Sequence, residues 1–323
     1  MNQRAGFAAG LLLGMALSFN ATAQNYPSKP IRVILPVPPG GTSDILARMI
    51  SQKLTEAWGQ QIIIDSRPGA NGNIGVDMLA RSPPDGYTLC LMDVGNLSIS
   101  PSMYSKLSFD ILRDLTPITL VSYSPHLVTV HPSVPVKTLQ ELLALAKSYP
   151  GKLNIPVALG RSVHLAGLSL QQRTGAKWVY VQTKGGSNSI MTVATGEGDL
   201  LFMGMLQTLP HVKSGRLKLI AVSSEKRDAA LPDVPTVAET PGLEGFFTGS
   251  WQGIIGPAKI PSDIVNRINA EVRRSLAMSD IKEKLATQGT TPMPTTPQEM
   301  GKWLAAEKDR WAKVVKDSGF KIE

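Results

Sequence analysis

Ser162 and His164 are the residues whose types and spacing come nearest to nucleophilic catalysis. A serine hydroxyl can attack a substrate when a histidine takes its proton, and Ser162-Val-His164 supplies both residue types. The two lie only two residues apart at the start of a predicted helix, so their side chains diverge, and no third group that would orient the histidine is identifiable. A hydrolase that uses this pair is therefore an alternative hypothesis. Turnover of a carboxylate ester that disappears in Ser162→Ala would support it.

Other catalytic and cofactor signatures are missing from the sequence. It contains no G-x-S-x-G elbow, no H-E-x-x-H and no C-x-x-C, and the segment 40–43 lacks the lysine of a P-loop. The glycines at 69, 72 and 75 do not spell the dinucleotide motif. A metal site needs several converging ligands, whereas the histidines lie one by one in separate predicted elements: His126, His131, His164 and His211. We therefore predict a protein that is not an enzyme and that carries no metal or cofactor.

The sequence does supply a series of loops that can bind a ligand through their backbone. The first, at 38–44, follows an apolar run and opens a helix, where unpaired N–H groups and the positive end of the helix dipole favour an anion. Taken alone, Gly40 and Gly41 could simply make the turn, and Thr42 or Ser43 could simply cap the helix. Similar loops recur at 71–73, 93–96, 160–164 and 184–188. Because open α/β sheets bind ligands at the carboxyl ends of their strands, we expect these loops to face one cleft.

The elements that position these loops alternate between strands and helices. The segment 29–36 predicts a strand, and apolar residues at helical spacing between 45 and 54 predict the helix after it. Repetition of this unit implies a mainly parallel sheet. A second block of the same kind begins near residue 125. Its predicted strands are 127–130, 153–157, 177–181, 199–203 and 217–222, and its predicted helices are 138–148, 162–173, 184–195 and 207–213.

The C-terminal part of the chain predicts helices without strands, at 262–277, 280–287 and 297–317. Helices alone cannot easily form a domain here, so we expect them to pack on the first block. The middle block is then an insertion reached by two crossings, near 121–125 and 229–235, which form a hinge beside a cleft. This predicts a signal peptide at 1–23, lobe 1 at 24–123 and 232–323, and lobe 2 at 124–231.

The N-terminus has the pattern of a cleavable secretory signal. Arg4 precedes an apolar run at 7–19, and Ala21-Thr22-Ala23 forms an A-x-A cleavage site. The alternative is a membrane anchor, which needs about 20 apolar residues, and this run is shorter. No cysteine stands at the cleavage site, so a lipoprotein is not expected. We predict an exported, soluble mature protein.

Composition limits the class of partner. Of 323 residues, 42% are hydrophobic and 18% are charged, which is typical of a globular chain. The formal net charge is +8, and Lys and Arg are spread along the chain rather than clustered with aromatic residues. A nucleic-acid footprint would be clustered. The sequence therefore predicts no nucleic-acid partner, and the charge at most favours an anionic ligand.

Several motifs together resemble the Bug family, the extracytoplasmic solute receptors of tripartite tricarboxylate transporters. They are the segment Pro30-Ile-Arg-Val-Ile-Leu-Pro-Val-Pro-Pro-Gly-Gly-Thr-Ser-Asp44, and those at 67–75, 84–89, 164–167, 184–185 and 231–239. They occur in the family's order across essentially the whole mature chain. The resemblance implies a two-lobed, flytrap-like periplasmic binding fold, with two mainly parallel sheets joined by a two-strand hinge. It also implies a monomeric receptor that meets a membrane transporter or a membrane sensor.

The resemblance also implies the ligand and the residues that hold it. The usual ligands are small carboxylates, which include di- or tricarboxylates, amino acids and aromatic acids, held by main-chain amides, hydroxyls and waters. The matching positions, with two departures from the family pattern added, are Pro38, Gly40, Gly41, Thr42, Asp44, Asn73, Asp93, Asn96, Arg161, Ser162, His164, Lys184, Gly185 and Gly186.

Three residues depart from the family pattern. Arg161 stands where relatives usually have small residues, Asp93 ends a strand where small or hydroxyl side chains are usual, and Thr183 replaces a common tyrosine before Lys184. Arg161 could reach a second carboxylate of the ligand, since a guanidinium suits bidentate pairing. It could instead pair with Asp93 as a latch across the cleft, or be a surface arginine without a role. Asp93 raises the further possibility of a ligand with an amine or ring nitrogen. The sequence leaves these readings open.

Overall fold

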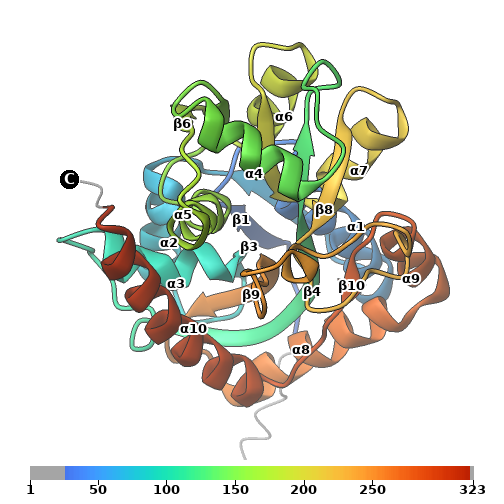
Figure 1. The fold of residues 1–323 in the computed structure, drawn as a ribbon. Coiled ribbons are helices and arrows are strands. Elements are labelled where there is room, and N and C mark those ends of the chain that lie inside the picture. Colours follow the sequence, from blue (N-terminus) through green and yellow to red (C-terminus); the bar gives the residue numbers. More distant parts are fainter. Residues whose placement is uncertain (1–25, 321–323) are drawn as a thin grey trace, which may run out of the picture.

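One long strand, β4 (Leu115–Val130), runs through the whole of the computed structural model, which describes residues 26–320 (Figure 1). Its first part pairs with β9 (Gly249–Pro257), and its last residues pair on either side with β7 (Leu200–Gly204) and β8 (Lys218–Val222). A single sheet therefore extends from one lobe into the other. The predicted signal peptide at 1–23 lies outside the described residues.

Lobe 1 is built on the strand order β10-β4-β9-β3-β1-β2. The strands β1 (Ile31–Leu35), β2 (Ile62–Ser66) and β3 (Thr88–Asp93) pair in parallel, as expected from their strand–helix repeats. However, β9 runs antiparallel to both β3 and β4, and β10 (Thr291–Pro292) runs antiparallel to β4. The prediction of mainly parallel sheets is wrong, because the chain re-enters this lobe from the opposite direction.

Helices cover both faces of the lobe 1 sheet. Alternating side chains of β1 point to opposite faces: Val33 and Leu35 contact the core that contains α1 (Thr42–Trp58) and α8 (Ser262–Ala277). Ile34 contacts the core on the other face, formed by α2 (Asn73–Ala80), α3 (Val94–Met103) and the start of α10 (Pro297–Ser318). The short helix α9 (Ser279–Ala286) joins the α1 and α8 side. The C-terminal helices thus pack on the first block.

Lobe 2 has its own continuous core. It contains the parallel pair β5 (Asn154–Val157) and β6 (Val179–Gln182), the strands β7 and β8, and the helices α4 (Leu139–Ser148), α5 (Ser162–Thr174), α6 (Gly186–Ala194) and α7 (Met205–Lys213). Val237, Leu243 and Phe246 are buried in the same core. The return crossing therefore lies at 248–249, not near 229–235 as the proline-rich stretch suggested, because these apolar side chains keep the intervening segment on lobe 2.

The two crossings lie side by side and are hydrogen-bonded to each other. His126 N donates to Thr248 O at 3.4 Å, and Thr248 N donates to Ser223 O at 2.8 Å. His126 Nδ1 lies 3.0 Å from Thr248 Oγ1, and the ring is fully buried. The hinge is therefore an ordered, polar seam between the lobes.

The C-terminal half of α10 also contacts both lobes (Figure 1). Trp311 and Val315 of α10 pack with Ile99 of α3 and with Leu165 of α5. The helix thus reaches beyond lobe 1 and covers one end of the hinge. No helix within residues 26–320 is both long and apolar enough to cross a membrane.

Candidate functional site

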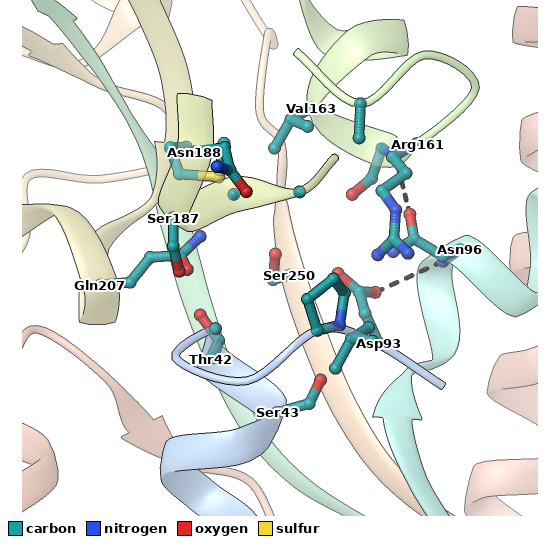
Figure 2. A pocket seen from close by; sticks show the side chains of 18 of the residues that line it. Thr42, Ser43, Asp93, Asn96, Arg161, Val163, Ser187, Asn188, Gln207 and Ser250 are labelled. Carbon is teal, nitrogen blue, oxygen red and sulfur yellow. Dashed lines mark hydrogen bonds between the residues drawn. The ribbon is translucent and has the colours of Figure 1, made fainter. Parts of the chain in front are cut away.

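A cavity of about 90 Å³ lies between the lobes, where several strands end and helices begin (Figure 2). Lobe 1 contributes the β1–α1 and β3–α3 junctions, lobe 2 contributes the β5–α5, β6–α6 and β7–α7 junctions, and β9 contributes two side chains near the hinge. The lining residues are Val37, Pro38, Pro39, Gly41, Thr42, Ser43, Asp93, Asn96, Ala158, Arg161, Ser162, Val163, Gly185, Gly186, Ser187, Asn188, Met203, Gln207, Ser250 and Gln252.

Three helices begin at this cavity without a capping side chain on their own N-cap residues, although Asn96 Oδ1 of lobe 1 already accepts from Ser162 N of α5. The N-cap residues Gly41 of α1, Arg161 of α5 and Gly185 of α6 make no side-chain capping hydrogen bond. The first turn of a helix has N–H groups without intrahelical partners, and the aligned peptide dipoles place roughly half a positive charge there. These three helix ends make the cavity attractive to an anion.

The N-terminus of α3, also at the cavity, is already neutralised. Asp93 is the N-cap of α3, and its Oδ1 accepts from Gly95 N at 2.9 Å and from Asn96 N at 3.4 Å. Asp93 is only 7% exposed. Burial raises the pKa of Asp93 to about 6, although the Ser250 hydroxyl, the backbone N–H groups and Arg161 oppose this rise.

Arg161 faces Asp93 from the other lobe (Figure 2). Its guanidinium points toward the Asp93 carboxylate, yet no ion pair within 4.0 Å joins them among the described residues. Burial lowers the pKa of Arg161, which Asp93 and Tyr104 partly oppose, and a guanidinium stays charged in proteins. The cavity thus holds one charge of each sign on opposite walls.

The lobes already touch each other around the cavity. Asn96 Oδ1 of α3 accepts from Ser162 N of α5 at 2.9 Å, and Asn71 Nδ2 donates to Leu159 O at 2.9 Å. Both bonds connect lobe 1 with lobe 2. This arrangement is a closed one.

Two buried polar atoms of the lining have no protein partner among the described residues. They are Thr42 Oγ1, at the start of α1, and Gln207 Oε1, in α7. Ser43, in contrast, donates to Gln252 Oε1 at 2.6 Å. Because a buried polar atom without a partner costs free energy, Thr42 and Gln207 are suited to bind a polar ligand.

The structure brings most of the sequence-predicted residues to this cavity. Those that line it are Pro38, Gly41, Thr42, Asp93, Asn96, Arg161, Ser162, Gly185 and Gly186. Arg161 does not lie on the open surface, because its side chain lines the cavity between the lobes; whether it has a role stays a prediction.

Gly40, Asp44, Asn73, His164 and Lys184 are not among the lining residues. Asp44 instead holds the β1–α1 loop, where its Oδ2 accepts from Gly40 N at 3.0 Å. Asn73 Oδ1 accepts from Ser100 Oγ at 2.8 Å, which ties α2 to α3. These side chains shape the loops that line the cavity rather than the cavity itself.

His164 is a packed core residue. Its ring lies edge-on to Tyr180 and Phe320, each with a centroid distance of 4.5 Å, and its Nδ1 accepts from Gly160 N at 3.1 Å. Burial lowers its pKa to about 4. No hydrogen bond connects His164 with Ser162 in the part of the chain that the structure describes. The geometry therefore does not pair Ser162 with His164, which removes the catalytic pair of the hydrolase hypothesis.

Sequence reasoning missed the contributions of β7–α7 and β9. Met203 and Gln207 flank a strand-to-helix junction of the same type as the predicted loops, so that signal was available in the predicted elements. Ser250 and Gln252 carried no comparable signal. They reach the cavity because Gln252 pairs with Asp93 in the β3–β9 register, a contact between residues far apart in the chain.

Comparison with known proteins agrees with this architecture. Residues 46–320 match the family model of the tripartite tricarboxylate transporter family receptor. The chain belongs to this family. The resemblance to Bug proteins and the two-lobed α/β binding-protein fold are thereby confirmed, apart from the strand directions corrected above.

The receptor is similar to several named relatives. It is 33% identical to protein BugT of Bordetella pertussis over 304 residues, which span 94% of this chain and 93% of the relative. The structure of Rpa4515 from R. palustris with adipate has a TM-score of 0.88 and 32% identity, and the match covers 91% of this chain and 98% of that one. MatC from Rhodopseudomonas palustris with bound malate has a TM-score of 0.83 and 28% identity, with coverage of 90% and 100%.

Proposed function

We propose that this receptor captures a small carboxylate between its lobes in the periplasm and presents it to a transporter of the tripartite tricarboxylate type. The observation that carries the proposal is the convergence of three uncapped helix N-termini, those of α1, α5 and α6, on one interlobe cavity. Backbone N–H groups bind a carboxylate through charge-assisted hydrogen bonds. Closure of the lobes removes water from these bonds and strengthens them.

The size of the cavity favours a short ligand. A volume of about 90 Å³ is several times the roughly 10–15 Å³ that a cavity needs to hold one water molecule. That corresponds to a carboxylate of a few carbon atoms. The adipate and malate of the two Rhodopseudomonas structures belong to this class of ligand.

Calorimetric titration of the mature protein with carboxylates of two to eight carbons tests the capture step. We expect saturable one-to-one binding, with a rise in melting temperature that grows with ligand concentration. Gly186→Ala is the diagnostic variant, since a Cβ there would lie 2.7 Å from Gln207 Nε2 and 3.2 Å from Met203 Sδ, inside the cavity. Gly301→Ala on α10 is the matched control, because its Cβ would lie 3.7 Å from Pro117 Cγ, away from the cavity.

The capture proposal fails if no carboxylate binds, or if Gly186→Ala and Gly301→Ala bind equally well. We expect Gly186→Ala to weaken binding about tenfold or more, because displacement of Gln207 removes a polar partner and the added methyl group takes ligand volume.

A membrane assay distinguishes delivery to a transporter from signalling to a membrane sensor. Proteoliposomes that contain the cognate membrane components should accumulate labelled carboxylate only when the receptor is added. Ligand-dependent binding to a sensor without uptake would favour the signalling alternative. Mass spectrometry of the periplasmic fraction should give a mature N-terminus at Gln24; a retained 1–23 segment would contradict export by a cleaved signal.

A further inference from the structure

We propose that Asp93 makes this receptor selective for carboxylates that carry a hydroxyl group beside the carboxylate, with Arg161 on the opposite wall as a partner for the ligand's negative charge. This inference rests on the proposed capture of a carboxylate in the interlobe cavity. It names the class of ligand that the two charged side chains, Asp93 and Arg161, would select.

The first observation is that Asp93 has more acceptor capacity than the protein uses. A carboxylate has two oxygens with about four lone-pair sites. Gly95 N and Asn96 N both donate to Oδ1, and the nearby Ser250 hydroxyl helps to oppose the rise of the Asp93 pKa. A buried carboxylate that lines a cavity and has unused acceptor capacity is suited to accept a hydrogen bond from a ligand.

The hinge competes with Asp93 for the Ser250 proton. Ser223 Oγ donates to Thr248 O, and Thr248 Oγ1 donates to Ser223 Oγ at 2.9 Å. Because the Thr248 hydroxyl already donates its proton to Ser223, it can only accept in its 3.0 Å contact with His126 Nδ1. His126 Nδ1–H is therefore the donor. His126 Nε2 is consequently an acceptor, and it lies 3.4 Å from Ser250 Oγ. A Ser250 proton donated to His126 is not available to Asp93, which leaves room for a donor from the ligand.

The second observation concerns the hypothesis that Arg161 pairs with Asp93 as a latch across the cleft. The lobes are already in contact through Asn96 and Ser162, yet Arg161 and Asp93 both line the cavity without an ion pair between them in the part of the chain that the structure describes (Figure 2). A latch would be expected to close in this arrangement. Because the two side chains are not paired with each other, both line the cavity with capacity left for a ligand.

The charges favour a hydroxyl over an ammonium group as the donor. Arg161 and Asp93 cancel each other, and the uncapped ends of α1, α5 and α6 add about half a positive charge each. The field of the cavity therefore favours a ligand with net negative charge. A hydroxycarboxylate supplies a donor for Asp93 and keeps that charge, whereas an ammonium group removes one unit of it.

Matched ligand pairs test this inference. Titrations compare 2-hydroxy acids with their unsubstituted parents from three to six carbons, such as malate with succinate and lactate with propionate, and include aspartate as the amino counterpart of malate. For the chain length that the wild-type protein binds, we expect the 2-hydroxy acid to bind about tenfold more tightly than its unsubstituted parent. This is the effect of a hydrogen bond to a charged group. Aspartate should bind more weakly than malate.

Asp93→Asn is the decisive variant. Asparagine is also a good N-cap, so one side-chain oxygen can keep the bonds to Gly95 N and Asn96 N, while an NH₂ donor replaces the second acceptor oxygen. We expect the hydroxyl preference to fall to about twofold or less. Asp110→Asn is the matched control, because Asp110 Oδ1 caps Leu112 N and Arg113 N in the same way at 2.8 and 2.9 Å but outside the cavity.

The outcomes separate this inference from the proposed function. Equal binding of parent and hydroxy acids by the wild type, a preference that Asp93→Asn retains, or aspartate as the tightest ligand would each overturn the role of Asp93 while carboxylate capture stands. If Asp93→Asn does not fold, Ser250→Ala provides the test. It removes one donor from Asp93, so the hydroxyl preference should be kept or increased, and its loss would count against the inference. Failure of every carboxylate to bind would overturn the proposed function itself.

Discussion

Protonation of His164 should couple the stability of this receptor to pH. The ring is 1% exposed and packs between Tyr180 and Phe320, and burial lowers its pKa from 6.5 to about 4. The folded protein therefore keeps the imidazole neutral at pH values where the unfolded chain binds a proton. Below pH 6.5, protonation of His164 stabilises the unfolded state, whereas the folded state is stabilised by this protonation only near pH 4.

The size of the effect follows from this difference. One pKa unit corresponds to about 1.4 kcal/mol, so His164 should cost about 2 kcal/mol of stability between pH 7 and pH 5 and about 3 kcal/mol by pH 4. His126, whose pKa burial lowers to about 3, acts in the same direction. Asp93 acts in the opposite direction, because its pKa is raised to about 6 and its protonation between pH 7 and pH 5 favours the folded state.

Urea unfolding of wild-type protein and His164→Asn at pH 7 and pH 5 isolates the contribution of His164. The variant keeps an oxygen that can accept from Gly160 N, loses aromatic contacts and should be less stable than wild type at pH 7. Between pH 7 and pH 5 the variant should lose about 2 kcal/mol less unfolding free energy than wild type, since His126 and Asp93 are common to both proteins. Far-UV circular dichroism checks that both are native at pH 5. Equal losses in the two proteins would refute the conclusion that folding holds His164 neutral.

Three further perturbations have defined outcomes. Asn96→Ala removes the bond to Ser162 N across the lobes and should speed release of bound carboxylate about fivefold, the effect of about 1 kcal/mol, in stopped-flow displacement; an unchanged rate would mean that this bond does not hold the lobes closed. Gly289→Ala should lower stability by about 2 kcal/mol or more, because φ is +62° and its Cβ would lie 1.9 Å from Met205 Cε. Gly215→Ala, with φ +73° and no atom within 4 Å, is its control for the backbone cost alone, so equal destabilisation would exclude a steric role for Met205. Cys90 is fully buried, and burial raises the pKa of its thiol; it should react with a thiol reagent only when the protein unfolds, and fast labelling under native conditions would contradict this core packing.

The local pattern of the sequence determined a large part of the fold and of the site. Apolar runs followed by glycine-rich turns and helical spacing predicted the β1–α1, β3–α3, β5–α5 and β6–α6 junctions, because each depends on residues close together in the chain. Gly41, Arg161 and Gly185 lie at three such junctions and line the cavity. The same local reasoning could not exclude Asp44 or His164, since the direction of a side chain at a helix start depends on what packs against it.

Only the tertiary structure decided where the chain returns between lobes and which distant residues complete the site. Val237, Leu243 and Phe246 keep their segment on lobe 2 by burial in its core, a preference that no local pattern expresses. The β3–β9 register places Gln252 beside Asp93 and brings Ser250 to the same end of the sheet. Strand pairing depends on backbone hydrogen bonds and on burial in the folded protein, and here it joins residues some 160 positions apart. A local sequence pattern therefore does not predict it. The sequence alone predicted loops that open helices at the carboxyl ends of strands, whereas the fold decided that Asp93, Arg161 and Ser250 would line one cavity.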